Sequence, residues 1–299
     1  MTFSIIGAGN CFKLWDNAFK ELGIKFSSVC DTNFEKLVKI ECPVYSNLDD
    51  LLSNDKSDYV IVATSVDSHY FLAEKIINSS RNVIIEKPIS YDYNHIDKLN
   101  NLAKEKGVRL LCAYHSAYSL DVDYFLTHRS LIEKDLGKLL GFECDFCDPY
   151  LIDGKLVSSA RSLHGSYLDS AINALSVVQR LIGLDNAISL TDNKLYVNDL
   201  TTSSESHYKI GNVSGVIRTS WEKGVNFKAT KIIYENGTVY LNHSMQNIEK
   251  NFNGNVTTID CNSSKKERLL NQYVSMIKAI TCESLELALN IQIYKLLLD

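Results

Sequence analysis

The chain has 299 residues, of which 45% are hydrophobic and 22% are charged, and its net charge is −5 at pH 7. This is the composition of a globular protein with a substantial core and a length that suits two domains. A negative chain without a basic cluster argues against nucleic acid or an anionic membrane as a partner, and no apolar run approaches the roughly 18 residues that span a bilayer. Because the chain enters a strand-like run almost at once, we expect no signal peptide and a cytoplasmic protein.

The first 118 residues alternate between strand-like and helical patterns. Helical patterns separate the strands, and one of them, over residues 93–106, is closed by Gly107. Such alternation predicts a parallel, doubly wound sheet, so we assign residues 1–118 to a first domain. Apolar runs predict its strands at residues 3–6, 25–30, 59–63, 82–85 and 109–113.

A strand that runs into a glycine turn opens this domain. Gly7 and Gly9, followed by Asn10, take the first two glycine positions of a dinucleotide fingerprint, which allow a tight turn and a close approach to a pyrophosphate. Phe12 stands at the third position. Asp31 follows the second strand, where a carboxylate accepts hydrogen bonds from ribose hydroxyls, although a surface aspartate capping a helix would look the same. With no arginine nearby, NAD is favoured over NADP.

Small and polar residues follow the next strand. Thr64 and Ser65 suit a loop that lies against the cofactor, and His69 comes shortly after them. On its own, His69 fits better as a polar residue at the start of a helix, with no role in the chemistry. We list all three as candidate cofactor-binding residues.

The tripeptide Glu86-Lys87-Pro88 follows the apolar run at residues 82–85. Ligands of open α/β sheets bind outside the carboxyl ends of the strands, so Lys87 is a candidate for contact with the group that the cofactor reacts with. Glu86 is a candidate for the cofactor site. A cis bond costs least before proline, and we hypothesise a cis peptide between Lys87 and Pro88.

The character of the sequence changes after residue 118. Residues 120–135 predict a helix, and Asn236-Gly237 is a hairpin signal because this pair accepts positive φ. A second helix is predicted at about residues 168–182, and the end of the chain, about residues 266–298, has a helical pattern. Strand-like runs joined by polar turns lie at residues 139–146, 187–190, 194–197, 205–210, 213–221, 228–234 and 238–241.

Eight cysteines are scattered along the chain, and Cys144 and Cys147 have the spacing of metal ligands. No second pair completes a zinc site, and the surrounding residues read as a strand. In a reducing compartment such cysteines are mostly small buried hydrophobes, so we expect no metal.

The helix over residues 168–182 carries a polar stripe that includes Asp169, Asn173, Ser176 and Arg180. Residues four apart share one face of a helix. On spacing alone this stripe is a solvated face. The alternative is that the carboxylate and the amide at the start of the helix point into a cleft.

Taken together, these motifs resemble the Gfo/Idh/MocA oxidoreductase family over nearly the whole chain. The resemblance implies an N-terminal Rossmann domain that binds NAD(P). It also implies a C-terminal α+β domain, residues 119–299, whose large open and mostly antiparallel sheet forms the substrate face and often the interface of a homodimer or homotetramer. The C-terminal helix is then expected to pack back on the first domain. The motifs are Gly7-Ala8-Gly9-Asn10, residues 58–64 with His69, Glu86-Lys87-Pro88, and Asp169 in its helix.

Within that family, residues 169–176 and Tyr114-His115-Ser116 look like the aldose 1-dehydrogenases of the galactose and arabinose type. Asn173 stands where the family often has histidine, and residues 147–167 match poorly. Those enzymes oxidise the anomeric hydroxyl of a free sugar to a lactone. The resemblance implies Asp169 as general base and Lys87 as the stabiliser of the reacting oxygen.

Other residues have weaker assignments. Asn173 would orient the hydroxyl, and His115 would contact the sugar or relay a proton, unless it is a core histidine. Trp221 and Glu222 would offer a stacking face and an acceptor to a sugar, unless they are a sheet-edge pair. Two alternatives stay open: an oxidoreductase acting on a nucleotide-linked sugar, and a non-catalytic sugar or dinucleotide sensor.

Overall fold

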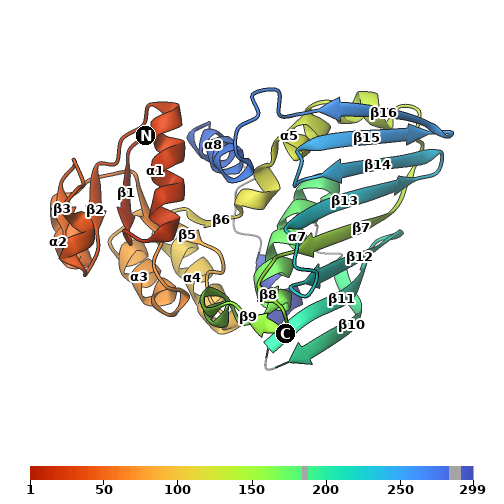
Figure 1. Ribbon diagram of the computed structural model, residues 1–299. Coiled ribbons are helices and arrows are strands. Elements are labelled where there is room, and N and C mark those ends of the chain that lie inside the picture. Colours follow the sequence, from red (N-terminus) through yellow and green to blue (C-terminus); the bar gives the residue numbers. More distant parts are fainter. Residues whose placement is uncertain (184–187, 199, 283–290, 299) are drawn as a thin grey trace. The chain divides into compact units, whose positions relative to one another are not determined.

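The computed structural model describes residues 1–183, 188–198, 200–282 and 291–298. It divides into two compact units (Figure 1). The first unit joins residues 1–114 to the described residues from Tyr273 onward, and the second comprises residues 115–272. The expected boundary at residue 118 lies inside the second unit, because the 3-10 helix η2 (His115–Tyr118) packs against helix α7 (Ser166–Ile182) of that unit.

A parallel six-stranded sheet forms the centre of the first unit. The strand order is β3-β2-β1-β4-β5-β6, and every neighbouring pair is parallel. This is the order of a doubly wound dinucleotide-binding domain, in which the ligand lies where the order reverses, at the carboxyl ends of β1 and β4. The strands are β1 (Phe3–Ile6), β2 (Ser28–Cys30), β3 (Val44–Tyr45), β4 (Tyr59–Val62), β5 (Asn82–Glu86) and β6 (Leu110–Ala113).

Helices cover both faces of this sheet, which explains why its strands read as short apolar runs. Helix α4 (Tyr93–Lys106) has the predicted bounds because Gly107 adopts the left-handed conformation, with φ of 65°, that ends a helix. The segment 266–298 forms two helices, and residues 283–290 lie outside the described residues. The other helices of the unit are α1 (Asn10–Leu22), η1 (Phe34–Leu37), α2 (Leu48–Asn54), α3 (Val66–Asn78), α8 (Arg268–Thr281), which begins in the second unit, and α9 (Ile291–Leu298).

An eight-stranded sheet dominates the second unit, in the order β10-β11-β12-β7-β13-β14-β15-β16. The pair β7 and β12 is parallel and every other neighbouring pair is antiparallel, as expected for a mostly antiparallel sheet. The strands are β7 (Leu139–Cys147), β10 (Ile188–Asn198), β11 (Leu200–Ile210), β12 (Val213–Ser220), β13 (Phe227–Tyr234), β14 (Gly237–Asn242), β15 (Asn247–Phe252) and β16 (Asn255–Asp260).

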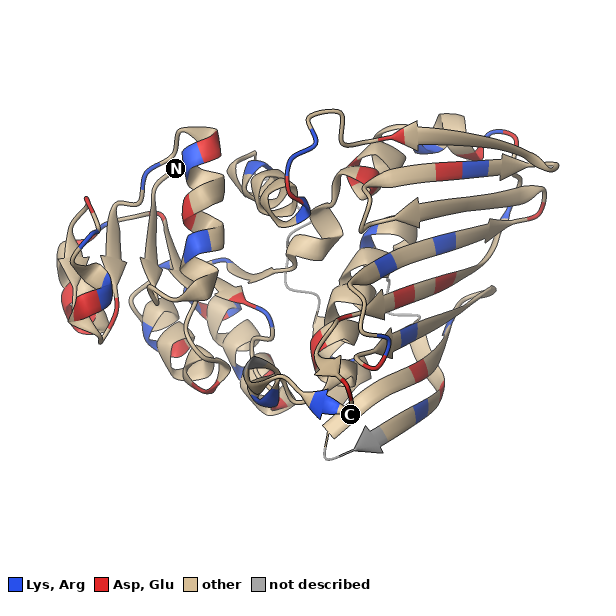
Figure 2. Cartoon of the chain, viewed as in Figure 1, with Lys and Arg blue, Asp and Glu red and all other residues tan. Residues whose placement is uncertain are grey.

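Helix α7 packs against β7, β11 and β12 on one face of the sheet, whose strands carry charged residues of both signs (Figure 2). Thr219 bonds to Ser166 of α7, so the neighbouring Arg218 points to the opposite face. On that opposite face Arg218 forms ion pairs with Glu143, Asp145 and Glu205, which come from the two neighbouring strands. The unit also contains α5 (Leu120–Thr127), α6 (Arg129–Glu133), η3 (Ser158–Leu163) and the short hairpin of β8 (Leu151–Ile152) and β9 (Lys155–Leu156).

Several expected elements differ in detail. The expected helix over residues 120–135 is broken at His128, whose ψ of 12° is not helical. The two runs at 187–190 and 194–197 are one strand, β10, and Ala187 lies outside the described residues. Strands β15 and β16 were missed because their sequences are polar.

The hairpin between β13 and β14 forms as predicted, but for a different reason. Neither Asn236 nor Gly237 has positive φ. Instead, a β-carbon at Gly237 would lie 2.0 Å from the carbonyl oxygen of Asn251 in β15, so the glycine is required by close strand packing. None of the described helices has the length and apolar character needed to cross a membrane.

Candidate functional site

Two glycines with different roles form the turn between β1 and α1. Gly7 has φ of 99°, and a β-carbon there would lie 2.5 Å from the carbonyl oxygen of Ala63. Gly9 is the N-cap of α1, and a β-carbon there would meet nothing within 4 Å. No side chain caps this helix, which begins at Asn10 and has no acidic residue in its first turn. Its N–H groups are therefore suited to an anion such as a pyrophosphate.

Asp31 holds a carboxylate beside this turn. Its Oδ2 accepts a hydrogen bond from the Ala8 N–H at 2.8 Å and from Lys36 Nζ at 3.2 Å, and its Oδ1 accepts one from the Asn33 N–H at 2.8 Å. Burial pushes the pKa of Asp31 upward, but the bonds from Asn33, Ala8 and Lys36 prevail and hold that pKa below its ordinary value. Together with Gly7 and Gly9, this ionised carboxylate fits the diphosphate and ribose of a dinucleotide.

Lys36 is a cation that the sequence reasoning overlooked. The argument for NAD considered only arginines, yet the Lys36 ammonium forms an ion pair with Asp31 at 3.2 Å. The lysine lies in the short helix η1, five residues after the aspartate, so local spacing was the available signal.

The loop after β4 is held by internal hydrogen bonds. Thr64 Oγ1 and Ser68 Oγ are 2.7 Å apart, and Ser65 is the N-cap of α3 without a side-chain capping bond. His69 is buried, with Nδ1 2.9 Å from the Pro88 carbonyl oxygen and Nε2 3.2 Å from that of Thr64. Burial lowers the pKa of His69, which favours the neutral ring. These are the contacts of a residue that braces the loops after β4 and β5.

The segment after β5 has the predicted cis peptide between Lys87 and Pro88. Lys87 is partly buried at the carboxyl end of the strand. Glu86 is buried, and its Oε1 accepts hydrogen bonds from Trp15 Nε1 at 2.7 Å and from the Tyr273 hydroxyl at 2.8 Å. Burial raises the pKa of Glu86. In these contacts Glu86 joins β5 to helices α1 and α8.

The polar stripe of α7 is not a solvated face, so that interpretation was wrong. Asp169 lies in the first turn of the helix and is 4% exposed, and Asn173, one turn later, is 6% exposed. Ser176 is buried too and donates its hydroxyl to the Asn173 carbonyl oxygen at 2.7 Å. Asn173 Oδ1 is buried and has no hydrogen-bond partner in the described part of the chain. Such a group costs free energy unless a ligand pairs with it, so this face of α7 is a candidate binding surface.

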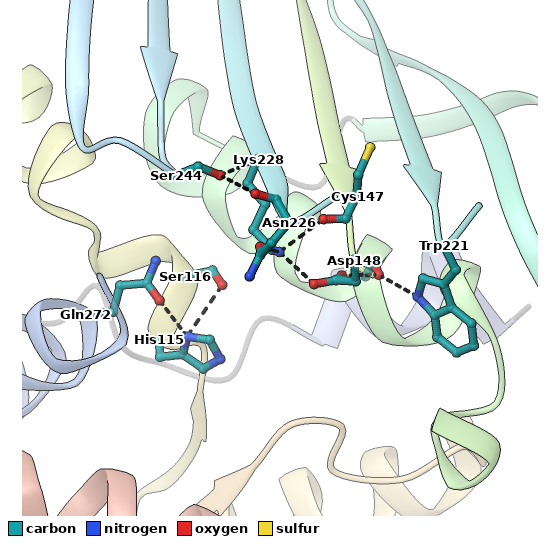
Figure 3. A network of polar contacts seen from close by, with 10 residues as sticks. His115, Ser116, Cys147, Asp148, Trp221, Asn226, Lys228, Ser244 and Gln272 are labelled. Atoms are coloured by element: carbon teal, nitrogen blue, oxygen red, sulfur yellow. Dashed lines mark hydrogen bonds and ion pairs between the residues drawn. The ribbon is translucent and has the colours of Figure 1, made fainter. Parts of the chain in front are cut away.

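A buried ion pair lies beside the start of α7 (Figure 3). Lys228 Nζ donates to Asp148 Oδ1 at 2.6 Å and to Asn226 Oδ1 at 2.7 Å. Asp148 Oδ2 accepts from the Ser170 hydroxyl at 2.8 Å, and Trp221 Nε1 donates to Ser170 Oγ at 3.3 Å. This network therefore holds Ser170 in place, and with it the preceding residue of α7, Asp169, which is the candidate base.

Two residues of this network correct or extend the sequence analysis. Trp221 is fully buried, with the Tyr150 ring edge-on at 5.1 Å, so it offers no stacking face to a sugar. Glu222 accepts a hydrogen bond from Thr202. Burial lowers the pKa of Lys228, a site residue that the sequence reasoning missed. Its carboxylate partner Asp148 is 80 residues away, and the pairing of β13 with β7 that brings them together cannot be read from local sequence.

His115 begins the second unit. Its Nδ1 lies 2.9 Å from Gln272 Oε1 and 3.5 Å from Ser116 Oγ (Figure 3). Gln272 is the last residue of the unit, so this hydrogen bond ties the two ends of the unit together. A role in sugar contact or proton relay stays a prediction.

The described residues contain no group of three or more histidine, cysteine or acidic side chains arranged to hold a metal ion. Cys144 and Cys147 are both buried in β7. They are three positions apart on a strand, and side chains at that separation point to opposite faces. The pair therefore has the wrong geometry for shared ligation.

Residues 1–114 match the model of an oxidoreductase family, Gfo/Idh/MocA, described as an NAD-binding Rossmann fold. An uncharacterised oxidoreductase of Schizosaccharomyces pombe is 34% identical over 113 residues, which are 38% of this chain and 30% of that protein. The oxidoreductase YhhX of Escherichia coli is 29% identical over 113 residues, 36% of this chain and 32% of that protein. The chain thus matches about a third of the length of these relatives.

Solved structures with similar folds cover more of the chain. An oxidoreductase from Agrobacterium radiobacter in complex with NAD+, L-tartaric acid and magnesium has a TM-score of 0.81 and 17% identity, over 99% of this chain and 94% of that one. Levoglucosan dehydrogenase in complex with NADH and levoglucosan has a TM-score of 0.80 and 13% identity, over 99% and 95%. The WlbA dehydrogenase of Bordetella pertussis with NADH and UDP-GlcNAcA has a TM-score of 0.68 and 18% identity, over 80% and 77%. At these identities the likeness establishes the fold.

Proposed function

We propose that this protein is an NAD-dependent dehydrogenase acting on a hydroxyl group of a sugar, because residues 1–114 match the NAD-binding Rossmann fold of the Gfo/Idh/MocA oxidoreductase family. The observation that carries the proposal is the glycine turn with the Asp31 carboxylate bonded to its Ala8 N–H at 2.8 Å. Bound NAD supplies the hydride acceptor. The substrate assignment draws on the buried carboxylate and amide of α7.

The cofactor roles follow from the geometry of the first unit. Gly7 and Gly9 let the backbone before Asn10 approach the diphosphate. Asp31 accepts hydrogen bonds from the ribose hydroxyls and repels a 2′-phosphate, which favours NAD over NADP. Thr64, at the carboxyl end of β4, stands with Ser65 and Glu86 as a proposed cofactor-site residue, although Glu86 acts there through the packing of β5.

The chemical roles are assigned to residues of both units. Asp169 takes the proton of the reacting hydroxyl as general base, and Asn173 orients that hydroxyl by donating to its oxygen from the side-chain amide. The buried Asn173 Oδ1, which has no partner among the described residues, accepts from another hydroxyl of the sugar. Lys87 donates to the reacting oxygen and stabilises the negative charge that develops on it. His115 contacts the sugar or relays a proton.

The leading substrate is a free aldose oxidised at C1 to a lactone. Residues 169–176 and Tyr114-His115-Ser116, which look like aldose 1-dehydrogenases, support this choice. The similar fold of levoglucosan dehydrogenase, solved in complex with levoglucosan, is consistent with it. The second candidate is a nucleotide-linked sugar, which the similar fold of a dehydrogenase solved with UDP-GlcNAcA favours.

A panel of free and nucleotide-linked sugars, each with NAD and with NADP, tests the proposal through the absorbance of the reduced cofactor. Turnover of free aldoses with a lactone product supports the leading substrate. Turnover restricted to nucleotide-linked sugars supports the second. Binding of sugar and NAD without any turnover would contradict the enzyme assignment and favour a sensor.

Assembly and location are further parts of the proposal. The family resemblance favours a cytoplasmic homodimer or homotetramer with the charged face of the eight-stranded sheet as its interface. Sedimentation velocity of the native protein and of Arg218→Glu measures the oligomeric state. Replacing the Arg218 guanidinium among Glu143, Asp145 and Glu205 gathers like charges, so the variant should dissociate. An unchanged sedimentation coefficient would place the interface elsewhere.

A further inference from the structure

Arg268 is a cation whose donors are not used by the part of the chain that the structure describes. It is the first residue of α8, and its side chain is partly buried. Among the residues that the structure describes, none forms a hydrogen bond or an ion pair with its guanidinium. A guanidinium has five N–H donors in a planar fork and stays charged in proteins. A recessed arginine whose donors have no acceptor among the described residues can bind an anion that comes from outside.

The carboxylates that attract Arg268 are committed to other groups. Burial lowers the pKa of Arg268, while Asp148 and Asp121 act in the opposite direction, which places both aspartates within electrostatic range. Both Asp148 oxygens already accept hydrogen bonds, from Lys228 at 2.6 Å and from Ser170 at 2.8 Å. Asp121 is fully buried and is bonded to His243 at 2.5 Å. Neither carboxylate bonds to the guanidinium.

Arg268 is linked to the proposed base through Asp148, which attracts the guanidinium and accepts a hydrogen bond from Ser170, the neighbour of Asp169 in α7, at 2.8 Å. Burial and Arg268 both lower the pKa of the Lys228 ammonium, and Asp148 and Asp169 raise it. Arg268 and Asp169 therefore both lie within electrostatic range of Lys228. The unpartnered Asn173 Oδ1 is one helix turn from Asp169. One region of the second unit thus holds unused donors, an unused acceptor and a buried carboxylate.

We propose that Arg268 binds an oxyanion carried by the substrate, either the carboxylate of a sugar acid or the phosphate of a phosphorylated or nucleotide-linked sugar. The planar fork of arginine matches two oxygens of such a group, whereas a neutral sugar offers it no charge. This inference rests on the proposed function and narrows it: the substrate of the dehydrogenase is acidic. Asp169 and Asn173 then act on the hydroxyl, and Arg268 holds the charged end.

Binding without turnover is the first test. The NAD-loaded protein is titrated calorimetrically with D-glucose, D-glucuronate, D-glucose 6-phosphate and UDP-glucose, with inorganic phosphate as a simple anion. In the native protein at least one anionic sugar should bind at least 10-fold more tightly than glucose. Arg268→Gln should remove this difference and leave glucose binding unchanged. Lys265→Gln, at an exposed lysine three residues earlier, is the matched control for a lost surface charge and should behave as the native protein.

The sugar ligands distinguish the source of the oxyanion. Preference for glucuronate identifies a carboxylate, preference for glucose 6-phosphate identifies a phosphate monoester, and preference for UDP-glucose identifies a diphosphate link. Turnover of the preferred class should fall roughly 10- to 100-fold in kcat/KM in Arg268→Gln, through KM rather than kcat. Arg268→Lys should recover part of the loss, because it keeps the charge without the fork.

Two results would overturn the inference. One is equal affinity of the native protein and Arg268→Gln for every anionic sugar, and the other is equal loss with neutral and anionic sugars. If Arg268→Gln unfolds at a lower temperature than the native protein, Arg268→Met, which keeps the aliphatic stem, replaces it in these measurements. Arginine-dependent anion binding without turnover of any sugar would leave the subsite standing and contradict the dehydrogenase assignment instead.

Discussion

The two units build polar sites in opposite ways. In the first unit the site is made of backbone: a glycine turn, the start of α1 and loops whose carbonyl oxygens lie 2.9 and 3.2 Å from the ring nitrogens of His69. In the second unit it is made of buried side chains, among them Lys228, Asp148 and Asn173, on a sheet face and the helix that covers it. A backbone site needs particular residues in a short stretch of sequence, whereas a side-chain site needs residues from many strands.

This difference separates recognition of a shared cofactor from recognition of a particular substrate. The turn around Gly7 suits any ligand with a diphosphate, because backbone N–H groups read shape and charge. The charged groups near Asp169 are side chains, which can change one at a time. The family match ends at residue 114, where the first stretch of the first unit ends.

The strongest challenge to this comparison is the proposed catalytic pair. Lys87→Ala and Asp169→Ala should each lower turnover by roughly 100-fold or more, because each removes charge stabilisation or proton transfer at the reacting hydroxyl. NAD binding, measured by fluorescence of the reduced cofactor, should survive in both variants. Asn173→Ala should lower turnover by less, because Asn173 only orients the reacting hydroxyl.

The control for this pair is thermal unfolding of each variant. A native unfolding temperature combined with near-normal turnover in both variants would remove Lys87 and Asp169 from the chemistry. A large drop in the unfolding temperature would instead assign the buried Asp169 a structural role.

The features that could be predicted from the sequence follow the same division between backbone sites and side-chain sites. The bounds of α4 were predictable because a left-handed glycine, Gly107, marks its end in the sequence itself. The cis bond before Pro88 and the parallel sheet were likewise local or periodic signals. Lys228 was not, because its carboxylate partner is 80 residues away and only strand register brings them together. Burial of the α7 stripe could not be read from spacing, since a solvated helix face and a covered one have the same period.

The two glycines of the turn sharpen the comparison within one unit. Gly7→Ala should destabilise the protein by roughly 2–4 kcal/mol, because the new β-carbon meets the Ala63 carbonyl 2.5 Å away and φ is 99°. Gly9→Ala should leave stability nearly unchanged, since its β-carbon meets nothing within 4 Å, yet weaken NAD binding where the cofactor must approach. Urea unfolding and NAD titration measure the two effects. Equal losses of stability would show that the turn is purely structural.

The preference for NAD over NADP tests whether the Asp31 side chain adds selectivity to a site that is otherwise formed by backbone groups. Asp31→Ser should lower the preference for NAD over NADP by roughly 10-fold or more, because the ribose hydroxyls lose a charged acceptor and a 2′-phosphate is no longer repelled. Lys36, freed from its 3.2 Å ion pair, becomes available to that phosphate. The double variant Asp31→Ser, Lys36→Ala should therefore regain less NADP activity. Comparable efficiency with both cofactors in the native protein would contradict the role of Asp31.

The smallest effect is expected at Glu86, a side chain buried within the unit that otherwise uses backbone. Its pKa is raised by burial, so the folded state holds the proton more tightly than the unfolded chain. Below the ordinary value of 4.5 both states are protonated and burial costs nothing in charge; as pH rises through the folded pKa, the buried carboxyl ionises and stability is lost. Glu86→Gln keeps an acceptor for Trp15 and Tyr273 but cannot ionise.

The free energy of unfolding of Glu86→Gln should therefore gain on that of the native protein as pH rises from 4.5, the starting point set by the ordinary carboxyl pKa. Urea unfolding of both proteins between pH 4 and 8 measures the difference. Asp97→Asn, a change at a carboxyl on the surface of α4, is the control and should give a curve parallel to the native one. Parallel curves for Glu86→Gln as well would mean that the hydrogen bonds from Trp15 and Tyr273 fully offset burial, leaving Glu86 ionised at little cost and free to hold a positive charge beside it.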